Sequence, residues 1–523
     1  MFYLNTKASY ETFKMVLSDE IYVDKTLMIA VLTKYINVEK RFFCVTKPGR
    51  FGKSINANML AAFYSKGVDS HDLFSDKKVA VQKDCMMHLN KHNVIYISLN
   101  EMPRHCDSYR SYIDAIEDCL INDLLEAYPK LASKRYPSLS KMLAATDDRF
   151  IFIFDEWDSI FYKSFMTADD KESYLRFLEG LLKGQPYVEL AYMTGVLPIA
   201  KYSSGSALNM FDEYSFLADD LFDRYFGFTQ TEVLELCQRY NQPSFEEIKY
   251  WYDGYFTTDG EALFNPRSVN SAFTRKKCRN YWTETGPMKE IEDCIKNNVE
   301  AVREDIVRLV SGDFIEIKLD GYSACDQRLE TRNEILSAMV VYGFLSYHDQ
   351  MLRIPNHELM EKFERALSIK GMGKVKEIVD RSEEMLAATL ACDCEKVAVI
   401  LEYIHDSEIP FINYNDENSL SCVITLAYLA ARDYYTVIRE EKSGKGYCDY
   451  LFIPNRKSRA AIILELKYEK SAEEALKQIK NKNYVQRVED YPEILLVGIN
   501  YSKTGDKHHT CVIEKFENRT CEN

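Results

Sequence analysis

The 523-residue sequence contains no hydrophobic run that approaches the roughly 20 residues needed to cross a bilayer. Its first residues, MFYLNTKASYETFKM, lack the apolar core of a secretory signal peptide. A repeat of fixed period and a low-complexity tract are also missing. We therefore expect a cytoplasmic protein that does not associate with a membrane.

Paired cysteine spacing is absent as well. The 14 cysteines are scattered, and only Cys392 and Cys394 come close together, with a single intervening residue that makes a poor zinc site. We interpret them as reduced thiols. Positive charge is scarce too, because the net charge is -15. This balance argues against nonspecific coating of DNA, but it allows a local basic groove or metal-bound contact with phosphates.

The content of 46% hydrophobic and 28% charged residues is ordinary for a soluble globular protein, and the length allows two to four domains. Apolar strands alternate with helical patterns in the first half, which predicts a parallel sheet covered by helices on both faces. The predicted strands cover residues 41–46, 93–100, 149–156 and 187–195.

The sequence pattern changes after about residue 230, where short helical segments and turns predict a small helical lid. Residues 298–368 then follow the order helix, short hairpin, helix, which is typical of a winged helix; a plain helical connector is the alternative. Another α/β unit begins near residue 376. We divide the chain into an N-terminal α/β domain (1–235), a lid with a winged-helix-like segment (236–375) and a C-terminal α/β domain (376–523).

A glycine-containing loop follows the first predicted strand and precedes a helix. Its residues are Pro48, Gly49, Arg50, Phe51, Gly52, Lys53 and Ser54. Such a loop lets backbone N–H groups and a helix N-terminus surround a phosphate chain. Lys53 would reach the β- and γ-phosphates of ATP, and Ser54 would ligate Mg²⁺. The usual first glycine of this motif is replaced by Lys47, so the match is incomplete.

The strand Phe150–Phe154 supplies the second half of such a site, because it runs directly into Asp155 and Glu156. Asp155 would hold the Mg²⁺ shell, and Glu156 would polarise the attacking water. Solvated acids at a strand end are the alternative interpretation of the two residues taken alone. Together with the loop upstream, they predict ATP binding.

Weaker candidates follow the fourth predicted strand. Thr194 ends that strand and could sense the γ-phosphate, and Lys201 could do similar work. Asn209 and Arg224 lie shortly after them and are further options. For each of these residues a surface or capping role is the alternative.

The C-terminal unit carries a second group of acids. In the strand Ala461–Lys467, the period of two places Glu465 and Lys467 on one face. Asp449 lies in an apolar strand upstream, and a hairpin centred between Arg456 and Lys457 would bring it opposite Leu464, one residue from Glu465. Two carboxylates would bind Mg²⁺ at a scissile phosphate, and Lys467 would orient the water or stabilise developing charge.

Three further residues fit this cluster. Glu417 precedes an apolar helix and could complete the metal shell, while Gln478 and Tyr484 follow on the next helix. An exposed Glu–Lys pair on an edge strand is the alternative interpretation. Asp449 across the hairpin, together with Gln478, favours a nuclease.

These segments resemble the AAA-ATPase-like family that is usually fused to a PD-(D/E)XK nuclease domain. The N-terminal resemblance rests on YVDKT (22–26), KPGRFGKS (47–54), IFDEWD (153–158), TGVLPIAK (194–201), FGFTQTEV (226–233), YDGY (252–255) and NPRSV (265–269). The C-terminal resemblance rests on YNDENSL (414–420), GKGYCDYLFIP (444–454), IILELKY (462–468) and QIKNKNY (478–484). The resemblance implies an α/β protein with a P-loop NTPase sheet, a helical lid and winged-helix-like segment, and a restriction-endonuclease-like α/β domain.

This chain departs from the family at three positions. The family commonly has arginines where this sequence has Lys47, Gly49 and Pro198. The first two changes leave Lys53 and Ser54 intact, while the third removes a basic group that might otherwise contact nucleotide. The expected cofactors are ATP and Mg²⁺, DNA is the expected partner, and a homo-oligomer is allowed.

Two functions compete at this point. The first is an ATP-controlled DNA endonuclease, acting for example on foreign or mobile DNA. The second is a nucleotide-dependent signalling or assembly switch whose C-terminal domain binds nucleic acid or protein without cleaving it. The intact set of Asp449, Glu465 and Lys467 favours the first.

Overall fold

The computed structural model describes most of the chain. The described residues are 2–103, 106–199, 207–216, 219–282, 300–319, 331–367, 374–406, 417–443, 446–456, 458–504 and 507–517. They form two compact units, one made of residues 1–288 and 317–358, the other of residues 289–316 and 359–523. The three-part division expected from the sequence stays a prediction, and each unit is described by itself.

A five-stranded parallel sheet organises the first unit. Its strands are β1 (Phe42–Thr46), β2 (Asn93–Ser98), β3 (Phe150–Asp155), β4 (Val188–Gly195) and β5 (Asp212–Tyr214). The spatial order is β2-β3-β4-β1-β5, and every pair is parallel. Four of these strands match the predicted ones to within two residues, whereas the short β5 was not predicted. The parallel sheet is confirmed.

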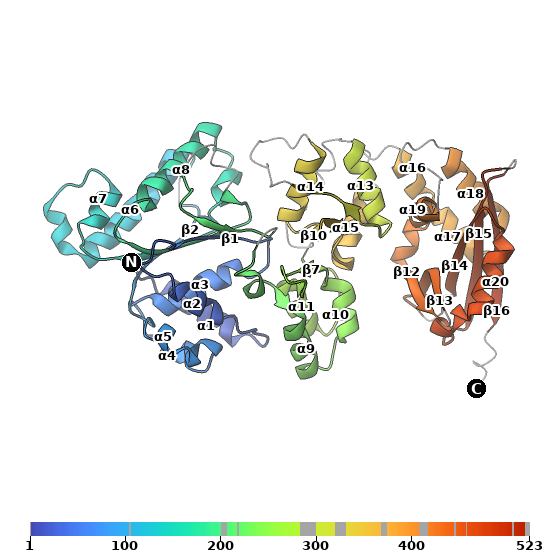
Figure 1. The fold of residues 1–523 in the computed structure, drawn as a ribbon, viewed down its shortest axis with the longest axis horizontal. Helices are drawn as coiled ribbons and strands as arrows, with labels where there is room; N and C mark the ends of the chain where they lie inside the picture. Colours follow the sequence, from blue (N-terminus) through green and yellow to red (C-terminus); the bar gives the residue numbers. More distant parts are fainter. Residues whose placement is uncertain are drawn as a thin grey trace. The chain divides into compact units, whose positions relative to one another are not determined.

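Helices cover both faces of this sheet. One face packs against α6 (Tyr109–Ala127), α7 (Leu139–Ala144) and α8 (Ala168–Leu182), while α1 (Ala8–Ser18), α2 (Leu27–Thr33) and α3 (Lys53–Tyr64) lie on the other (Figure 1). Two shorter helices, α4 (His71–Phe74) and α5 (Lys83–Met86), follow α3. Phe150, Phe152 and Phe154 alternate along β3 and enter the core beneath α6 to α8. Burial on both faces explains why the strands are nearly continuous apolar runs.

The lid follows the sheet within the same unit. Its elements are α9 (Gln230–Arg239), α10 (Phe245–Tyr252), α11 (Pro266–Arg275) and the short strands β6 (Phe228–Thr229), β7 (Tyr255–Phe256) and β8 (Ala262–Phe264). Thr229 and Ser244 begin α9 and α10 with capping boxes, and Asn265 caps α11 ahead of a proline. The apolar faces of the three helices share one core.

The segment expected to resemble a winged helix has the predicted order. It contains α14 (Arg332–Val341), the hairpin of β10 (Ser346–His348) and β11 (Met351–Arg353), and α15 (His357–Leu367). Asp349 and Gln350 form the two-residue turn and both have positive φ, at 50° and 63°. Such a turn matches the twist of paired strands, so a hairpin interrupts the helices here. The plain helical connector is therefore wrong.

The second unit contains a mixed sheet. Its strands are β12 (Tyr435–Ser443), β13 (Gly446–Pro454), β14 (Ala461–Tyr468), β15 (Glu493–Tyr501) and β16 (His509–Glu517), in that spatial order. The pair β14–β15 is parallel and is connected by α20 (Ala472–Lys482), while the other neighbours are antiparallel. The remaining elements are α13 (Glu300–Val310), β9 (Ile315–Glu316), α16 (Lys374–Asp380), α17 (Ser382–Leu390), α18 (Cys394–Asp406) and α19 (Glu417–Ala427).

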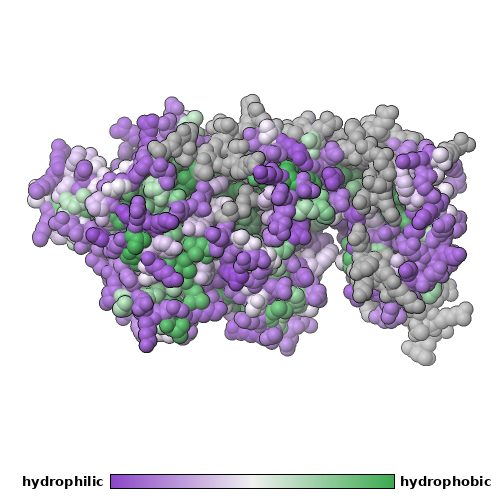
Figure 2. Space-filling view, in the orientation of Figure 1, coloured by the Kyte–Doolittle hydropathy of each residue, from purple (hydrophilic) through white to green (hydrophobic). Residues whose placement is uncertain are grey.

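The surface facing the viewer in Figure 2 is largely hydrophilic, with small apolar patches between charged and polar residues. Among the described helices, none combines the length and apolarity that crossing a membrane requires.

Candidate active sites

The phosphate loop joins the end of β1 to the start of α3. Gly52 stands at the helix N-cap with φ 90°, and Arg50 also has a positive φ, 71°. Left-handed residues turn the chain sharply ahead of the helix, in the manner of loops that present successive N–H groups to an anion. The free N–H groups in the first turn of α3 add to this anion-binding potential.

Lys53 is buried against the loop that precedes it. Its Nζ donates to the carbonyl oxygens of Lys47 at 2.9 Å and Pro48 at 2.8 Å. Burial lowers the pKa of Lys53, while the charges of Asp158, Glu156 and Asp155 oppose that shift. A cation surrounded by three acids and the phosphate loop is well placed to bind the phosphates of a nucleotide.

Strand registers bring the two halves of this site together. Thr46 at the end of β1 lies beside Gly195 of β4, and Asp155 at the end of β3 lies beside Thr194. The carboxyl ends of β1, β4 and β3 therefore meet at one edge of the sheet, where ligands bind in parallel α/β folds. The sequence did not predict that β4 would separate β1 from β3.

Asp155 has the environment of a metal ligand. It is 4% exposed, and Tyr96 donates its hydroxyl to Oδ2 at 3.3 Å. Burial raises the pKa of Asp155 to about 6, while the hydroxyl of Ser54 and the charge of Lys53 oppose the rise. Within the described residues, Oδ1 is buried and has no hydrogen bond of normal geometry. An acidic oxygen left in this state fits a divalent cation, which Ser54 and Asp155 would hold together.

The residue after Asp155 is held in a rare conformation. Glu156 has φ 53°, which is uncommon for a side chain of this size. Strained backbone of this kind concentrates at functional sites, where neighbouring contacts enforce it. Trp157 supplies such contacts: its N–H donates to the carbonyl of Thr194 at 3.0 Å and its Nε1 to that of Leu197 at 3.0 Å.

Asp158 is a functional candidate that the sequence reasoning did not single out. It is 2% exposed, and its carboxylate accepts from the backbone N–H groups of Val196, at 3.1 Å, and Leu197, at 2.8 Å. Burial raises its pKa, and the Leu197 amide and Lys53 oppose the rise. Asp158 thus fixes the turn after β4 close to Lys53. Its place three residues after Asp155, in the segment IFDEWD, was the signal available.

Two residues, Lys47 just before the loop and Phe51 within it, anchor the loop to the rest of the unit. Lys47 forms a buried ion pair with Asp219, with Nζ 2.6 Å from Oδ2. Phe51 is 1% exposed and packs edge-on against Phe216 and Tyr255. A cation fastened in this way explains how Lys47 can stand where the usual motif has glycine, because its side chain is directed to Asp219.

Other predicted nucleotide contacts have different outcomes. The hydroxyl of Thr194 donates to the carbonyl of Val45 at 2.9 Å, so it joins β4 to β1. Arg224 lies at the surface and pairs with Asp259 at 3.0 Å. Lys201 lies outside the described residues. Arg50 lies near Arg267 and Glu156, and partial burial together with Arg267 lowers the pKa of its guanidinium.

In the second unit, the hairpin of β13 and β14 differs in register from the prediction. Tyr450 lies opposite Leu464, so Asp449 is not the partner of Leu464. The predicted turn centre was half a residue too early, because Tyr450, Leu451 and Phe452 pair with Leu464, Ile463 and Ile462 in turn. Extended by one residue, the observed register places Asp449 opposite Glu465, and no bulge is needed.

Next to the two acids, a side-chain hydrogen bond replaces the backbone pairing between β13 and β14. Backbone pairing runs from Phe452 to Tyr450, and beyond it Asp449 Oδ2 accepts from the backbone N–H of Leu466 at 2.6 Å. The Asp449 carboxylate therefore lies against β14 next to Glu465. Its charge, after burial, contributes to raising the pKa of Glu465 to about 7.

Glu465 is the centre of a buried polar network. It is 1% exposed, and its Oε1 accepts from Lys467 Nζ at 3.0 Å and from Gln478 Nε2. Gln478 in turn lies 3.4 Å from the hydroxyl of Tyr484. Within the described part of the chain, Glu465 Oε2 is buried and has no hydrogen-bond partner. An unsatisfied carboxylate oxygen beside a second acid fits a divalent cation held by Asp449 and Glu465.

The helix α20 closes over this network. Ala461 and Ile463 precede Glu465 on the same face of β14 and share a core with Leu476 and Ile479 of α20. Gly498 of β15 lies beside Glu465, and a Cβ on it would stand 2.2 Å from the Ala472 carbonyl. Glycine is therefore required for α20 to approach the sheet and bring Gln478 to Glu465.

The side chain of Glu417, the remaining predicted metal ligand, lies outside the described residues, although its backbone begins α19. The same helix covers the other face of the sheet. Tyr450 there exchanges hydrogen bonds with Ser421 at 2.6 Å and Thr425 at 2.8 Å.

Two family models match separate parts of this chain. Residues 8–204 match a family model described as "Predicted AAA-ATPase", and residues 415–510 match one described as "PD-(D/E)XK nuclease superfamily". Residues 8–204 therefore belong to an AAA-ATPase-like domain, and residues 415–510 belong to a PD-(D/E)XK nuclease-like domain. The fusion and the fold class expected from the sequence are confirmed.

Similarity to another protein extends along nearly the whole chain. A protein of Azotobacter chroococcum mcd 1, described as "Uncharacterized protein in vnfD 5'region", is 23% identical over 510 residues, which are 93% of each chain. A solved structure of the Aeropyrum pernix ORC2 protein in ADPNP-ADP complexes covers 66% of this chain and 96% of its own, with 13% identity and a TM-score of 0.32.

The two family matches coincide with the two polar clusters. The AAA-ATPase-like match contains Lys53, Ser54, Asp155 and Glu156, and the nuclease-like match contains Asp449, Glu465, Lys467 and Gln478. In the part of the chain that the structure describes, each cluster leaves one buried carboxylate oxygen without a hydrogen bond of normal geometry. The roles of the individual residues stay predictions.

Proposed function

We propose that this protein binds and hydrolyses ATP in its AAA-ATPase-like domain and cleaves DNA with the metal-dependent nuclease-like domain. The ATPase part of this proposal is supported by the alignment of β1, β4 and β3, which brings Lys53, Asp155 and Glu156 to one edge of the sheet. The nuclease part is supported by the buried Oε2 of Glu465, which lies next to Asp449 and Lys467.

In the ATPase domain, loop N–H groups and Lys53 would bind the β- and γ-phosphates, while Ser54 and Asp155 would hold Mg²⁺. Mg²⁺ held by these two residues would supply positive charge next to the phosphates. Glu156 would orient the attacking water, and Asp158 would keep the turn after β4 in place. We assign Asp158 a structural role because its carboxylate already accepts hydrogen bonds from two backbone N–H groups. The metal and the water are therefore assigned to Asp155 and Glu156.

In the nuclease domain, Asp449 and Glu465 would hold Mg²⁺ at the scissile phosphodiester. The cation lowers the pKa of a bound water and stabilises charge on the phosphate. Lys467 would orient that water or contact the phosphate, and Gln478 would fix Glu465 through Oε1. The described cysteines are free thiols, which supports a reducing, cytoplasmic setting.

The ATPase test compares Lys53→Ala with Glu156→Gln. Loss of Lys53 should abolish ATP binding, measured by calorimetry, because the phosphates lose their buried cation. Glu156→Gln should bind ATP and hydrolyse it at least a hundredfold more slowly, since the Mg²⁺ ligands remain. Lys480→Ala, a change at a half-exposed lysine on α20, serves as the control and should match wild type in both assays. Equal turnover in wild type and Glu156→Gln would contradict the assignment.

The nuclease test measures nicking of supercoiled plasmid with Mg²⁺ or Mn²⁺. Asp449→Ala and Glu465→Ala should weaken Mn²⁺ binding and abolish nicking, whereas Lys467→Ala should bind Mn²⁺ and still fail to cut. All three should retain ATP binding. DNA binding without nicking by the wild-type protein would refute the nuclease half and favour the switch function.

A further inference from the structure

A second cluster of possible ligands lies in the nuclease-like unit, outside the network of Glu465. Only 9 of the 523 residues are histidines, yet His405, His508 and His509 gather at one place. The rings of His405 and His508 stack with their centres 4.3 Å apart. Glu402 lies one helical turn before His405 on α18, so the two share a helix face.

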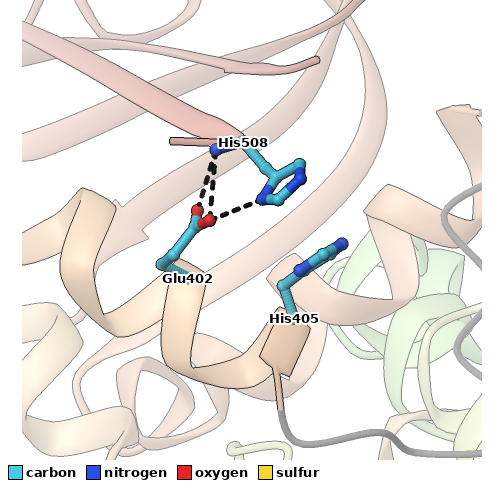
Figure 3. Close-up of side chains that lie close together, drawn as sticks. All are labelled: Glu402, His405 and His508. Atoms are coloured by element: carbon cyan, nitrogen blue, oxygen red, sulfur yellow. Dashed lines mark hydrogen bonds and ion pairs between the residues drawn. The ribbon is translucent and has the colours of Figure 1, made fainter. Parts of the chain in front are cut away.

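Three of these residues can act as metal ligands together. Glu402, His405 and His508 each offer a nitrogen or oxygen atom, and these atoms lie within 4.8 Å of one another. Figure 3 shows Glu402 and His405 projecting from one helix toward His508, which directly precedes β16. Ligands of one Zn²⁺ stand about 2.0–2.1 Å from the ion, so side-chain shifts of about 1 Å would bring the three ligand atoms onto one ion and leave the fourth position to water.

Contacts around the cluster already fix its members. The Glu402 carboxylate accepts from the backbone N–H groups of His508, at 3.1 Å, and His509, at 3.1 Å, and lies 2.6 Å from His508 Nδ1. His405 Nε2 lies 3.3 Å from the hydroxyl of Tyr501. Orientation of ligands by neighbouring hydrogen bonds is a regular feature of protein metal sites. The hydrogen bonds from the backbone N–H groups of His508 and His509 position the Glu402 carboxylate without a metal, so the ligand atoms are already close together before an ion binds.

The donor set selects the kind of ion. Two imidazoles and one carboxylate suit Zn²⁺ and related transition metals, whereas Mg²⁺ prefers oxygen ligands such as Asp449 and Glu465. We propose that Glu402, His405 and His508 form a binding site for one transition-metal ion of the Zn²⁺ class. The ion joins α18 to β16, two elements separated by about one hundred residues of sequence. This site is independent of the proposed cleavage chemistry.

The test measures Zn²⁺ affinity of the full-length protein by competition with a chromogenic chelator. An Asp449→Ala background removes the predicted oxygen site, so the difference in Zn²⁺ affinity between histidine variants reports on the site of Glu402, His405 and His508. His405→Ala should weaken Zn²⁺ binding at least tenfold. This variant spares the contacts of Glu402 with His508 and His509, so an unchanged circular dichroism spectrum is expected. His71→Ala, a change at an exposed histidine on α4, is the matched control and should bind as its parent does.

Two further measurements separate this site from adventitious binding. Co²⁺ should give one equivalent of tetrahedral visible absorption, and Glu402→Gln, which keeps the size and an acceptor oxygen, should diminish that absorption. Zn²⁺ should also slow hydrogen exchange in residues 395–406 and 509–512 of the parent and leave it unchanged in His405→Ala. Equal Zn²⁺ affinity in His405→Ala and His71→Ala, or exchange that ignores Zn²⁺, would overturn the proposal.

Discussion

Replacing Gly195 by alanine tests whether the turn after β4 is as tightly packed as the structure indicates. An added Cβ would stand 2.3 Å from Asp158 Oδ1 and 2.5 Å from Trp157 Cδ1, whereas ordinary contacts lie at 3.4–4 Å. Asp158 would therefore have to move by about 1 Å or more, and its bonds to the backbone N–H groups of Val196 and Leu197 would be lost or badly stretched.

The size of the effect follows from those two bonds. A hydrogen bond to a charged group contributes about 1.5–3 kcal/mol, so we expect the first unit to lose about 3–5 kcal/mol of unfolding free energy. ATP affinity should fall as well, because Asp158 is one of the acids beside Lys53. Urea unfolding and calorimetric ATP titration measure the two effects.

The matched control is Gly180→Ala in α8. A Cβ at Gly180 would meet no atom within 4 Å. Alanine favours a helix over glycine, so this variant should gain about 0.5–1 kcal/mol and bind ATP normally. If Gly195→Ala unfolded at the same urea concentration as wild type and bound ATP equally well, the structural role assigned to Asp158 would be wrong.

Three other variants probe contacts around the two sites. Lys47→Met should cost about 3–5 kcal/mol of unfolding free energy by leaving Asp219 charged and buried, and a second change, Asp219→Leu, should recover part of it in the same urea assay. Gly498→Ala should push α20 away from the sheet and lower plasmid nicking at least tenfold, with ATP binding retained. Thr194→Val should lose about 1 kcal/mol and keep its ATPase rate, because its hydroxyl donates to β1; a loss of hydrolysis would restore the γ-phosphate role.

Local patterns in the sequence were sufficient to predict the main strands of the parallel sheet in the ATPase-like unit. Strands such as β3 are continuous apolar runs bounded by turn residues, so their limits could be predicted to within two residues. The positions of Lys53 and Asp155 at strand ends followed directly. The role of Asp158 did not, because it depends on the backbone of Val196 and Leu197, which lie about forty residues downstream. Contacts at that separation leave no local periodicity.

In the nuclease-like unit, the predicted register between β13 and β14 was wrong by one residue. Symmetry about Arg456 and Lys457 placed Asp449 opposite Leu464, and the observed pairing of Tyr450 with Leu464 is one residue different. A one-residue slip moves every side chain to the other face, so hydrophobic pattern normally constrains register. Here both faces of β14 are buried, and the pattern could not distinguish the two registers.

The environment of Glu465 also required the fold. An exposed Glu–Lys pair on an edge strand was the alternative, but β14 lies between β13 and β15 and has no free edge. Its face carries Ala461 and Ile463 into the core below α20, and Glu465 follows where that core ends. Placing a carboxylate there is costly unless its oxygens are satisfied, and Lys467 and Gln478 satisfy only Oε1. The buried Oε2 is thus the strongest physical reason to look for a cation at this site.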